Sequence, residues 1–210
     1  MIQNNLVISI LPKQQQILFN ELSDRHFIKD YYLVGGTALA LQIGHRISID
    51  FDFFCKNDID LDFLKSEIKV FGKIEIFQEK KNTLHCRINN IRVSFISYKY
   101  KILDDCIVHN KIFIAGLNDI ACMKLSAVSS RGSKKDFIDL FYLLRHTSFK
   151  KIFKNFKKKY GDMAVNEYQI MKSLLYFEDA ENEPMPIMKE KIEWKEIKKK
   201  IQTEVKKIVN

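Results

Sequence analysis

The chain has 210 residues and a formal net charge of +9, and 46% of its residues are hydrophobic. This length allows a sizeable buried core, in one domain or in one domain with a helical extension. No apolar run reaches the roughly eighteen residues of a membrane-spanning helix, and the N-terminal sequence lacks the features of a signal peptide. We therefore exclude a membrane-spanning helix and expect a soluble, cytoplasmic protein.

The chain is predicted to begin with a helix over 12–30, followed by a short buried strand over 31–34. The apolar residues expected to face inward from this helix are Ile17, Leu18, Leu22 and Phe27. Next, Gly35 and Gly36 predict a tight turn, and Thr37 is expected to cap a helix through Ile43. Because a helix N-terminus presents backbone N–H groups and a positive dipole end, this turn predicts a phosphate-binding site.

The segment ISIDFDFF, residues 47–54, predicts a strand that carries two aspartates. Since strand side chains alternate between faces, Asp50 and Asp52 are expected on the same face. Two close carboxylates repel each other unless a cation lies between them, and Mg²⁺, with Mn²⁺ as the alternative, is the expected ion. Mg²⁺ usually takes one or two carboxylates together with substrate phosphates, which leaves room for a nucleotide. The combination of glycine turn and paired aspartates, more than either alone, predicts a catalytic site.

Further helix and strand patterns follow in order along the chain. A helix is predicted over 60–70, and strands over 73–77, 83–89, 91–98 and 111–115. Asn89 and Asn90 fit a two-residue hairpin turn. From residue 117 the pattern becomes helical, with Asn118 and Ser133 expected to cap helices that run through Ser129 and about His146. An acidic loop is predicted over 178–186. We therefore predict an α+β chain with a sheet-based core over 1–116 and a helical subdomain over 117–210.

Positive charge gathers in two of the predicted helices. Between Arg145 and Tyr160 every charged residue is Lys or Arg, with aromatic residues at helical spacing. The C-terminal helix, from Lys189, places its lysines and glutamates opposite an apolar stripe that includes Ile192. A solvated surface is one interpretation of these helices. The other is a phosphate-binding surface for RNA, whose affinity would fall steeply with salt.

Three segments of the chain resemble a known family. The string GGTALALQIGHRISIDFDFF, residues 35–54, resembles the first motif of AbiEii/AbiGii toxins, which have the nucleotidyltransferase fold of the DNA polymerase β superfamily. Residues 117–144 are similar to that family's helical region, and residues 173–186 match more weakly. The resemblance implies a nucleotidyltransferase-fold core, with a mixed β-sheet flanked by helices, and a helical C-terminal subdomain that completes the active-site cleft.

The resemblance also implies residue roles where the motifs match. Asp50 and Asp52 match the catalytic metal-binding pair. The residues expected at the phosphate turn are Gly35, Gly36 and Thr37, with Arg46 either reaching a phosphate or pairing with an acid. Lys124 matches a helical lysine that contacts the triphosphate, and Asp136 matches an acid with a catalytic role. Asp139 would orient a neighbour, and a capping or salt-bridge role stays open for both of these aspartates.

One position departs from the superfamily pattern. Many nucleotidyltransferases place a third carboxylate on a later strand, where it acts as a general base or binds a second metal. The corresponding residue here is Ser94, whose hydroxyl cannot do that work at neutral pH. Glu75, on an adjacent predicted strand, is an alternative acid. This departure is compatible with binding of a metal and a nucleotide, and it leaves turnover open.

The resulting hypothesis is an Mg²⁺-dependent nucleotidyltransferase that moves a nucleoside monophosphate from an NTP to RNA, such as the 3′ end of a tRNA. The resemblance implies that the protein is the toxin of a bacterial toxin–antitoxin or abortive-infection pair, with a cognate antitoxin as partner. Two alternatives remain: transfer to a small molecule or protein, and a catalytically silent module that binds nucleotide or RNA.

Overall fold

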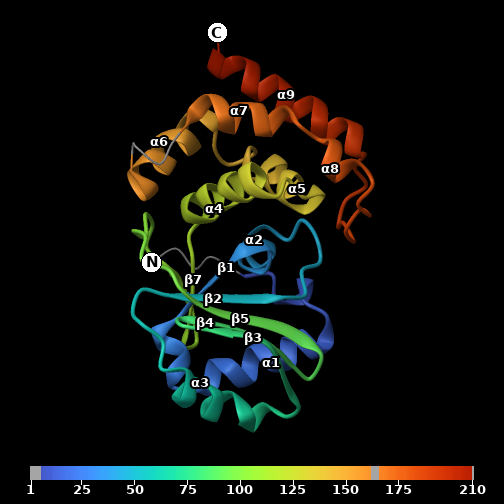
Figure 1. Ribbon diagram of the computed structural model, residues 1–210. Coiled ribbons are helices and arrows are strands. Elements are labelled where there is room, and N and C mark those ends of the chain that lie inside the picture. Colours follow the sequence, from blue (N-terminus) through green and yellow to red (C-terminus); the bar gives the residue numbers. More distant parts are fainter. Residues whose placement is uncertain (1–5, 162–165, 210) are drawn as a thin grey trace. The chain divides into compact units, whose positions relative to one another are not determined.

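The computed structural model describes residues 6–161 and 166–209 (Figure 1). Residues 1–5, at the start of the N-terminal sequence that lacks signal-peptide features, lie outside this range. Residues 162–165 and Asn210, which belong to the predicted helical subdomain, also lie outside it. The chain forms two compact units. The sheet unit comprises the chain up to Tyr100 together with Asp105–Gly116, and the helical unit comprises Lys101–Asp104 and the chain from Leu117. The predicted role of the helical part in completing a cleft stays a prediction.

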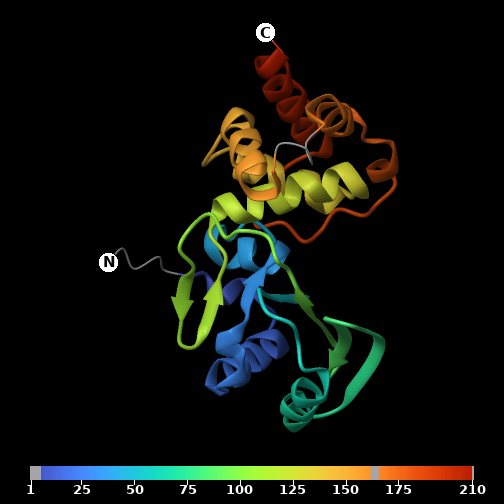
Figure 2. The same cartoon turned by 60° about the vertical axis from the view of Figure 1, so that its left-hand side comes forward.

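Seven strands of the described chain form one mixed sheet in the order β3-β4-β5-β2-β1-β7-β6. Their bounds are β1 Tyr32–Val34, β2 Phe51–Cys55, β3 Ile74–Lys80, β4 Thr83–Ile88, β5 Ile91–Ser97, β6 Ile107–His109 and β7 Ile112–Ile114. Strand β2 is the middle strand of this order, and it runs antiparallel to β1 and parallel to β5. Figure 2 shows the β6–β7 hairpin, of which the sequence predicted only the second strand.

Three α-helices accompany the sheet: α1 Lys13–Asp24, α2 Gly35–Ile43 and α3 Leu61–Ile68. Short 3-10 helices occupy Ile8–Ile10, Phe27–Asp30 and Lys69–Phe71. Helices α1 and α3 lie on one side of the sheet (Figure 1). Alternate residues of the central strands are buried, as Phe51, Phe53 and Phe95 illustrate. The residues between them, which include Asp52 and Ser94, are half-buried and belong to the opposite face.

The first predicted helix is shorter than expected, and the prediction that Ile17 faces inward is wrong. Helix α1 ends at Asp24 because Arg25 adopts an extended conformation. Leu18 and Leu22 are buried as expected, but Ile17 is 49% exposed. The buried stripe of the helix runs through 18 and 22, and a residue one position earlier is rotated away from it by about 100°.

The hairpin between β4 and β5 confirms the predicted turn. Asn89 and Asn90 have φ values of 48° and 70°, the left-handed backbone that a two-residue turn needs at both positions. The turn pairs Ile88 with Ile91 and thereby fixes the register of the two strands.

The helical unit contains α4 Leu117–Ser130, α5 Lys134–Leu143, α6 Phe149–Tyr160, α7 Glu167–Leu175, α8 Glu178–Glu181 and α9 Trp194–Val209. None of the helices in the described chain combines the length and apolar character needed to span a membrane. Part of the predicted acidic loop is helical, as α8. Ile192 precedes α9, whereas Ile197 and Ile201 form its buried stripe.

The predicted caps of α4 and α5 differ in outcome. Asn118 is wrong as a cap because α4 already begins at Leu117, and the backbone N–H of Asn118 donates instead to the Asp104 carboxylate at 3.0 Å. Ser133 does occupy the N-cap position of α5. Its hydroxyl donates to Asp136 Oδ2 at 2.9 Å and makes no capping bond to the backbone.

Candidate active site

The glycine turn lies directly against one of the paired aspartates in the sheet unit. Val34, the last residue of β1, is paired with Asp52 on β2, so the turn begins beside this carboxylate. A Cβ added to Gly35 would lie 2.9 Å from Asp52 Oδ2. Gly35 also has a φ of 73°, which favours glycine. The turn therefore has two reasons to carry glycine at this position, and one of them is the closeness of the carboxylate.

Thr37 does not cap a helix, so that prediction is wrong. Helix α2 begins at Gly35, and its N-cap residue is Val34, because the left-handed Gly35 turns the chain into the helix earlier than expected. The Thr37 hydroxyl instead donates to the backbone carbonyl of Asp50 and lies 2.9 Å from the hydroxyl of Ser48. Thr37 thus ties the first turn of α2 to the backbone that enters the aspartate strand.

Asp50 lies just before β2, which begins at Phe51, and Asp52 lies within it. Both side chains are half-buried. Among the described residues, no group of three or more His, Cys, Asp or Glu is placed to hold a metal ion. Two carboxylates beside a turn at a helix N-terminus fit an ion that takes its other ligands from water and substrate phosphates, which is the habit of Mg²⁺.

Arg46 is packed against the same turn. It is only 4% exposed, and its Nη1 donates to the backbone carbonyl of Ile47 at 3.1 Å. A Cβ added to Gly36 would collide with Arg46 Nη2 and would lie 3.2 Å from the hydroxyl of Ser48. The guanidinium therefore lies against Gly36, in the space that a side chain at this position would fill. Gly36 belongs to the phosphate turn that the sequence predicts.

The strand register decides what lies beside the aspartates. Ser94 on β5 is paired with Asp52, so the position expected to carry a third carboxylate is indeed next to the paired aspartates. The alternative acid, Glu75, is wrong as a substitute. Its strand β3 is separated from β2 by β4 and β5, and its carboxylate pairs with Lys73 at 2.9 Å.

His85 is a residue that the sequence patterns did not single out. It is paired with Ser94, and its Nδ1 lies 2.9 Å from Ser94 Oγ. The two-residue turn at 89–90 contained the signal, because a hairpin that pairs 88 with 91 also pairs 85 with 94.

Lys124, Asp136 and Asp139 come together in the helical unit. Lys124 Nζ lies 3.0 Å from Asp136 Oδ1 and 2.5 Å from Asp139 Oδ2. Both carboxylates are fully buried, and Asp136 also accepts a hydrogen bond from Arg131 Nε at 2.7 Å. The salt-bridge role left open for both aspartates is therefore the one seen here. The predicted contact of Lys124 with a triphosphate and the predicted catalytic role of Asp136 stay predictions.

The cations around Asp136 determine its ionisation. Burial alone would raise the pKa of this carboxyl. The hydrogen bond from Arg131 and the charges of Lys124 and Arg131 lower it more, so the pKa of Asp136 lies below its usual range. Asp136 is therefore a carboxylate at neutral pH.

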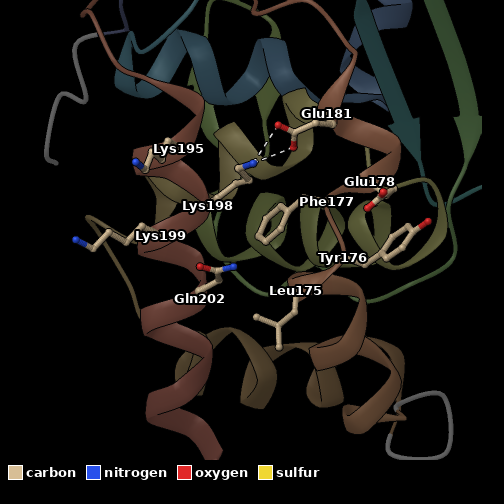
Figure 3. Close-up of a pocket in the computed structure, with 9 residues that line it drawn as sticks. All are labelled: Leu175, Tyr176, Phe177, Glu178, Glu181, Lys195, Lys198, Lys199 and Gln202. Atoms are coloured by element: carbon tan, nitrogen blue, oxygen red, sulfur yellow. Dashed lines mark hydrogen bonds and ion pairs between the residues drawn. The ribbon is translucent and has the colours of Figure 1, made fainter.

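The helical unit also contains a pocket of about 470 Å³, which Figure 3 shows between α9 and the segment joining α7 to α8. It is lined by Leu175, Tyr176, Phe177, Glu178, Glu181, Lys195, Lys198, Lys199 and Gln202. Lys198 reaches across to Glu181 at 2.9 Å, while Lys195 and Lys199 extend from the exposed side of α9. Because acids and bases both line it, the pocket by itself does not identify a ligand.

Comparison with known proteins places the chain in a family. Residues 16–109 match the family model described as "Nucleotidyl transferase AbiEii toxin, Type IV TA system". An uncharacterized protein of Aquifex aeolicus is 38% identical over 204 residues, which cover 93% of this chain and 96% of that protein. The chain belongs to the AbiEii nucleotidyltransferase toxin family. The matched residues contain the glycine turn, both aspartates, His85 and Ser94.

Solved structures with the same fold confirm the predicted α+β nucleotidyltransferase class of this AbiEii family member. MenT4, a nucleotidyltransferase toxin from Mycobacterium tuberculosis, is 12% identical with a TM-score of 0.59, over 95% of this chain and 86% of that one. JHP933 from Helicobacter pylori is 19% identical with a TM-score of 0.54, over 94% of this chain and 93% of that one. At these identities the likeness shows the fold alone.

Proposed function

We propose that this AbiEii family protein is an Mg²⁺-dependent enzyme that transfers a nucleoside monophosphate from an NTP to RNA. The observation that carries the proposal is the close approach of the turn to the aspartate strand, where a Cβ added to Gly35 would lie 2.9 Å from Asp52 Oδ2. A phosphate-binding turn placed against a metal-binding carboxylate is the arrangement that a metal-bound triphosphate requires.

Each part of this site has a distinct task. Asp50 and Asp52 would hold Mg²⁺, which when bound neutralises charge on the triphosphate. Backbone N–H groups at the start of α2 bind phosphate oxygens, and the Arg46 guanidinium, which lies against Gly36, adds positive charge beside them. An acceptor hydroxyl oxygen then forms a bond to the α-phosphorus while the bond to the β-phosphate oxygen breaks, and pyrophosphate leaves. The residues contribute mainly by positioning and by charge.

RNA is the acceptor that the charge distribution favours. The formal charge is +9, and the exposed lysines of α6 and α9 supply much of it. Such surfaces bind phosphate backbones without reading bases, and Lys195 and Lys199 beside the pocket of Figure 3 add to one. The family description, a type IV toxin–antitoxin system, supports a cognate antitoxin as partner. A cytoplasmic location belongs to the same proposal.

The test is nucleotide transfer by the purified protein. Wild type would be incubated with each α-labelled NTP, Mg²⁺ or Mn²⁺, and total RNA, beside a variant carrying Asp50→Ala and Asp52→Ala. Asp62→Asn is a suitable control because this side chain on α3 is 95% exposed. We expect label in RNA from wild type and the control, and none from the double variant. Equal labelling by all three proteins would contradict the proposal.

A silent binding module is the second candidate, and Ser94 is the observation that favours it. A serine paired with Asp52 stands where an acid is expected. Two measurements separate the silent module from the enzyme. In calorimetric titrations, a silent module binds RNA with a steep salt dependence. It releases no pyrophosphate in the presence of NTP and Mg²⁺. Transfer to a protein or small molecule would appear as label outside the RNA fraction.

A further inference from the structure

We propose that His85 and Ser94 form a proton relay that takes the place of the third carboxylate. The inference rests on the proposed function and assigns the group that accepts the proton of the attacking hydroxyl. It begins from one row of the sheet, in which Asp52 on β2 is paired with Ser94 on β5, and Ser94 with His85 on β4. Residues paired across neighbouring strands point to the same face, so all three belong to one side of the sheet.

That side is the polar one. Ser94 and His85 are half-buried, while the residues that alternate with them, such as Val93, Leu84 and Cys86, are fully buried. The relay is therefore not part of the apolar core. Ser94 Oγ lies 2.9 Å from His85 Nδ1, a normal hydrogen-bond distance.

The side chain that shares a hydrogen bond with the His85 imidazole is that of Ser94. From β3, Gln78 is paired with His85, and the ring of Phe77 stacks on the imidazole with centroids 6.2 Å apart. The charged groups on this side include Asp52, which is paired with Ser94, and Arg87 and Arg92, each two residues from a member of the pair. On β3, Glu75 is paired with Arg87 and Lys80 with Thr83, so both belong to the same side. Arg87 is itself engaged, 3.7 Å from Glu75 and over the Phe77 ring. Among the described strands β2, β3, β4 and β5, Asp52 is the acid paired with Ser94, and no acid is paired with His85.

The chemistry balances without any further reagent. The acceptor hydroxyl oxygen bonds to the α-phosphorus, and the pyrophosphate leaves with the electron pair of the broken bond. The hydroxyl proton passes to Ser94 Oγ as the serine proton passes to His85 Nδ1, and the resulting imidazolium later releases a proton to water. This requires the neutral tautomer with hydrogen on Nε2 and a lone pair on Nδ1. Serine alone is too weak a base for the task, whereas a serine joined to histidine is an established combination.

The first test uses transfer kinetics for wild type, His85→Gln, Ser94→Ala and the double variant H85Q/S94D. Glutamine retains hydrogen bonding without accepting a proton, so we expect kcat to fall roughly 100-fold in H85Q and S94A, with the KM for NTP unchanged. The pH–rate profile of H85Q should lack one limb that the wild-type profile shows. In H85Q/S94D the new carboxylate should restore activity and move that limb to lower pH. His109→Gln, on the far edge strand β6, is the matched control.

The second test needs no activity. The ¹⁵N spectrum of His85 in the protein without NTP or metal should show the Nε2–H tautomer with Nδ1 as acceptor, and S94A should shift the Nδ1 resonance. The relay is overturned by an Nδ1–H tautomer, by wild-type kinetics and pH profile in H85Q, or by an inactive H85Q/S94D with an unchanged melting temperature. If wild type transfers label and the Asp50, Asp52 double variant does not, these outcomes reject the relay alone. If wild type transfers nothing, the proposed function and the relay fail together.

Discussion

At the scale of single residues, the site depends on how closely Gly35 approaches the Asp52 carboxylate. A side chain at Gly35 would strain the left-handed backbone and would also displace Asp52 Oδ2, 2.9 Å away. Backbone strain and carboxylate displacement are separable effects, because other glycines of the chain have a positive φ without such a neighbour.

Gly35→Ala is expected to destabilise the fold by about 1–2 kcal/mol and to abolish nucleotide transfer. Gly161→Ala is the control, because Gly161 also has a positive φ, 89°, but no atom within 4 Å of an added Cβ. Denaturant unfolding and transfer assays on both variants check this. Loss of transfer in both, or in neither, would disconnect activity from the closeness of Gly35 to Asp52.

Asp136 is expected to make stability depend on acid pH. Because its pKa is lowered in the folded protein, its contribution is complete above the unfolded value of about 3.9 and is lost as pH falls through the lower folded value. Asp136→Asn should remove this contribution and leave Lys124 in a weakened buried network, at a cost of about 3–5 kcal/mol at pH 7. Urea unfolding of both proteins between pH 2 and 7 measures it. A constant difference between them across that range would contradict the assignment.

At the scale of elements, a buried ion pair anchors the short segment that begins the helical unit. The Asp119 carboxylate on α4 accepts N–H groups from Leu103 at 2.9 Å and from Asp104 at 3.0 Å. Lys159 on α6 lies 2.6 Å from the same carboxylate and donates to the carbonyl of Lys101 at 2.7 Å. One acid and one base thereby hold segment 101–104 to two helices.

Lys159→Met should cost about 3–5 kcal/mol, because it leaves the Asp119 carboxylate buried without its cation. Adding Asp119→Leu should recover part of that loss, and Lys158→Met, at an exposed position on α6, should cost little. Hydrogen exchange at the Leu103 and Asp104 amides should accelerate in Asp119→Leu. Additive costs in the double variant would show that the two groups do not act together.

At the scale of the whole molecule, the excess of lysine predicts how the proposed binding of RNA depends on charge and salt. Reversing charge with Lys195→Glu and Lys199→Glu on α9 should weaken RNA binding and make log affinity fall less steeply with log salt, because fewer RNA phosphates are then neutralised by lysine. Lys80→Glu with Lys81→Glu makes the same change in net charge on the sheet unit. Filter binding at several salt concentrations compares them. Equal effects would mean that net charge, and not the α9 surface, governs binding.

The sequence by itself determined the features that depend on neighbouring residues. Strand alternation and glycine chemistry act over a few positions, so the left-handed bend at Gly35, the strand that carries Asp52 and the left-handed Asn89-Asn90 turn could be found from it. The bounds were less exact, because α2 already begins at Gly35 and β2 begins only at Phe51. The resemblance of these motifs to AbiEii toxins supplied the fold class. Cap positions were less certain, as Thr37 and Asn118 show, because a cap depends on the backbone around it.

Only the tertiary structure decided which distant residues meet. Strand order places β5 beside β2 and leaves two strands between Glu75 and β2, and it aligns His85 with Ser94 and Asp52 in one row. Helix packing buries Asp119 with Lys159, residues 40 positions apart. Such pairings follow from how the whole core closes on itself, and local propensity carries little information about them.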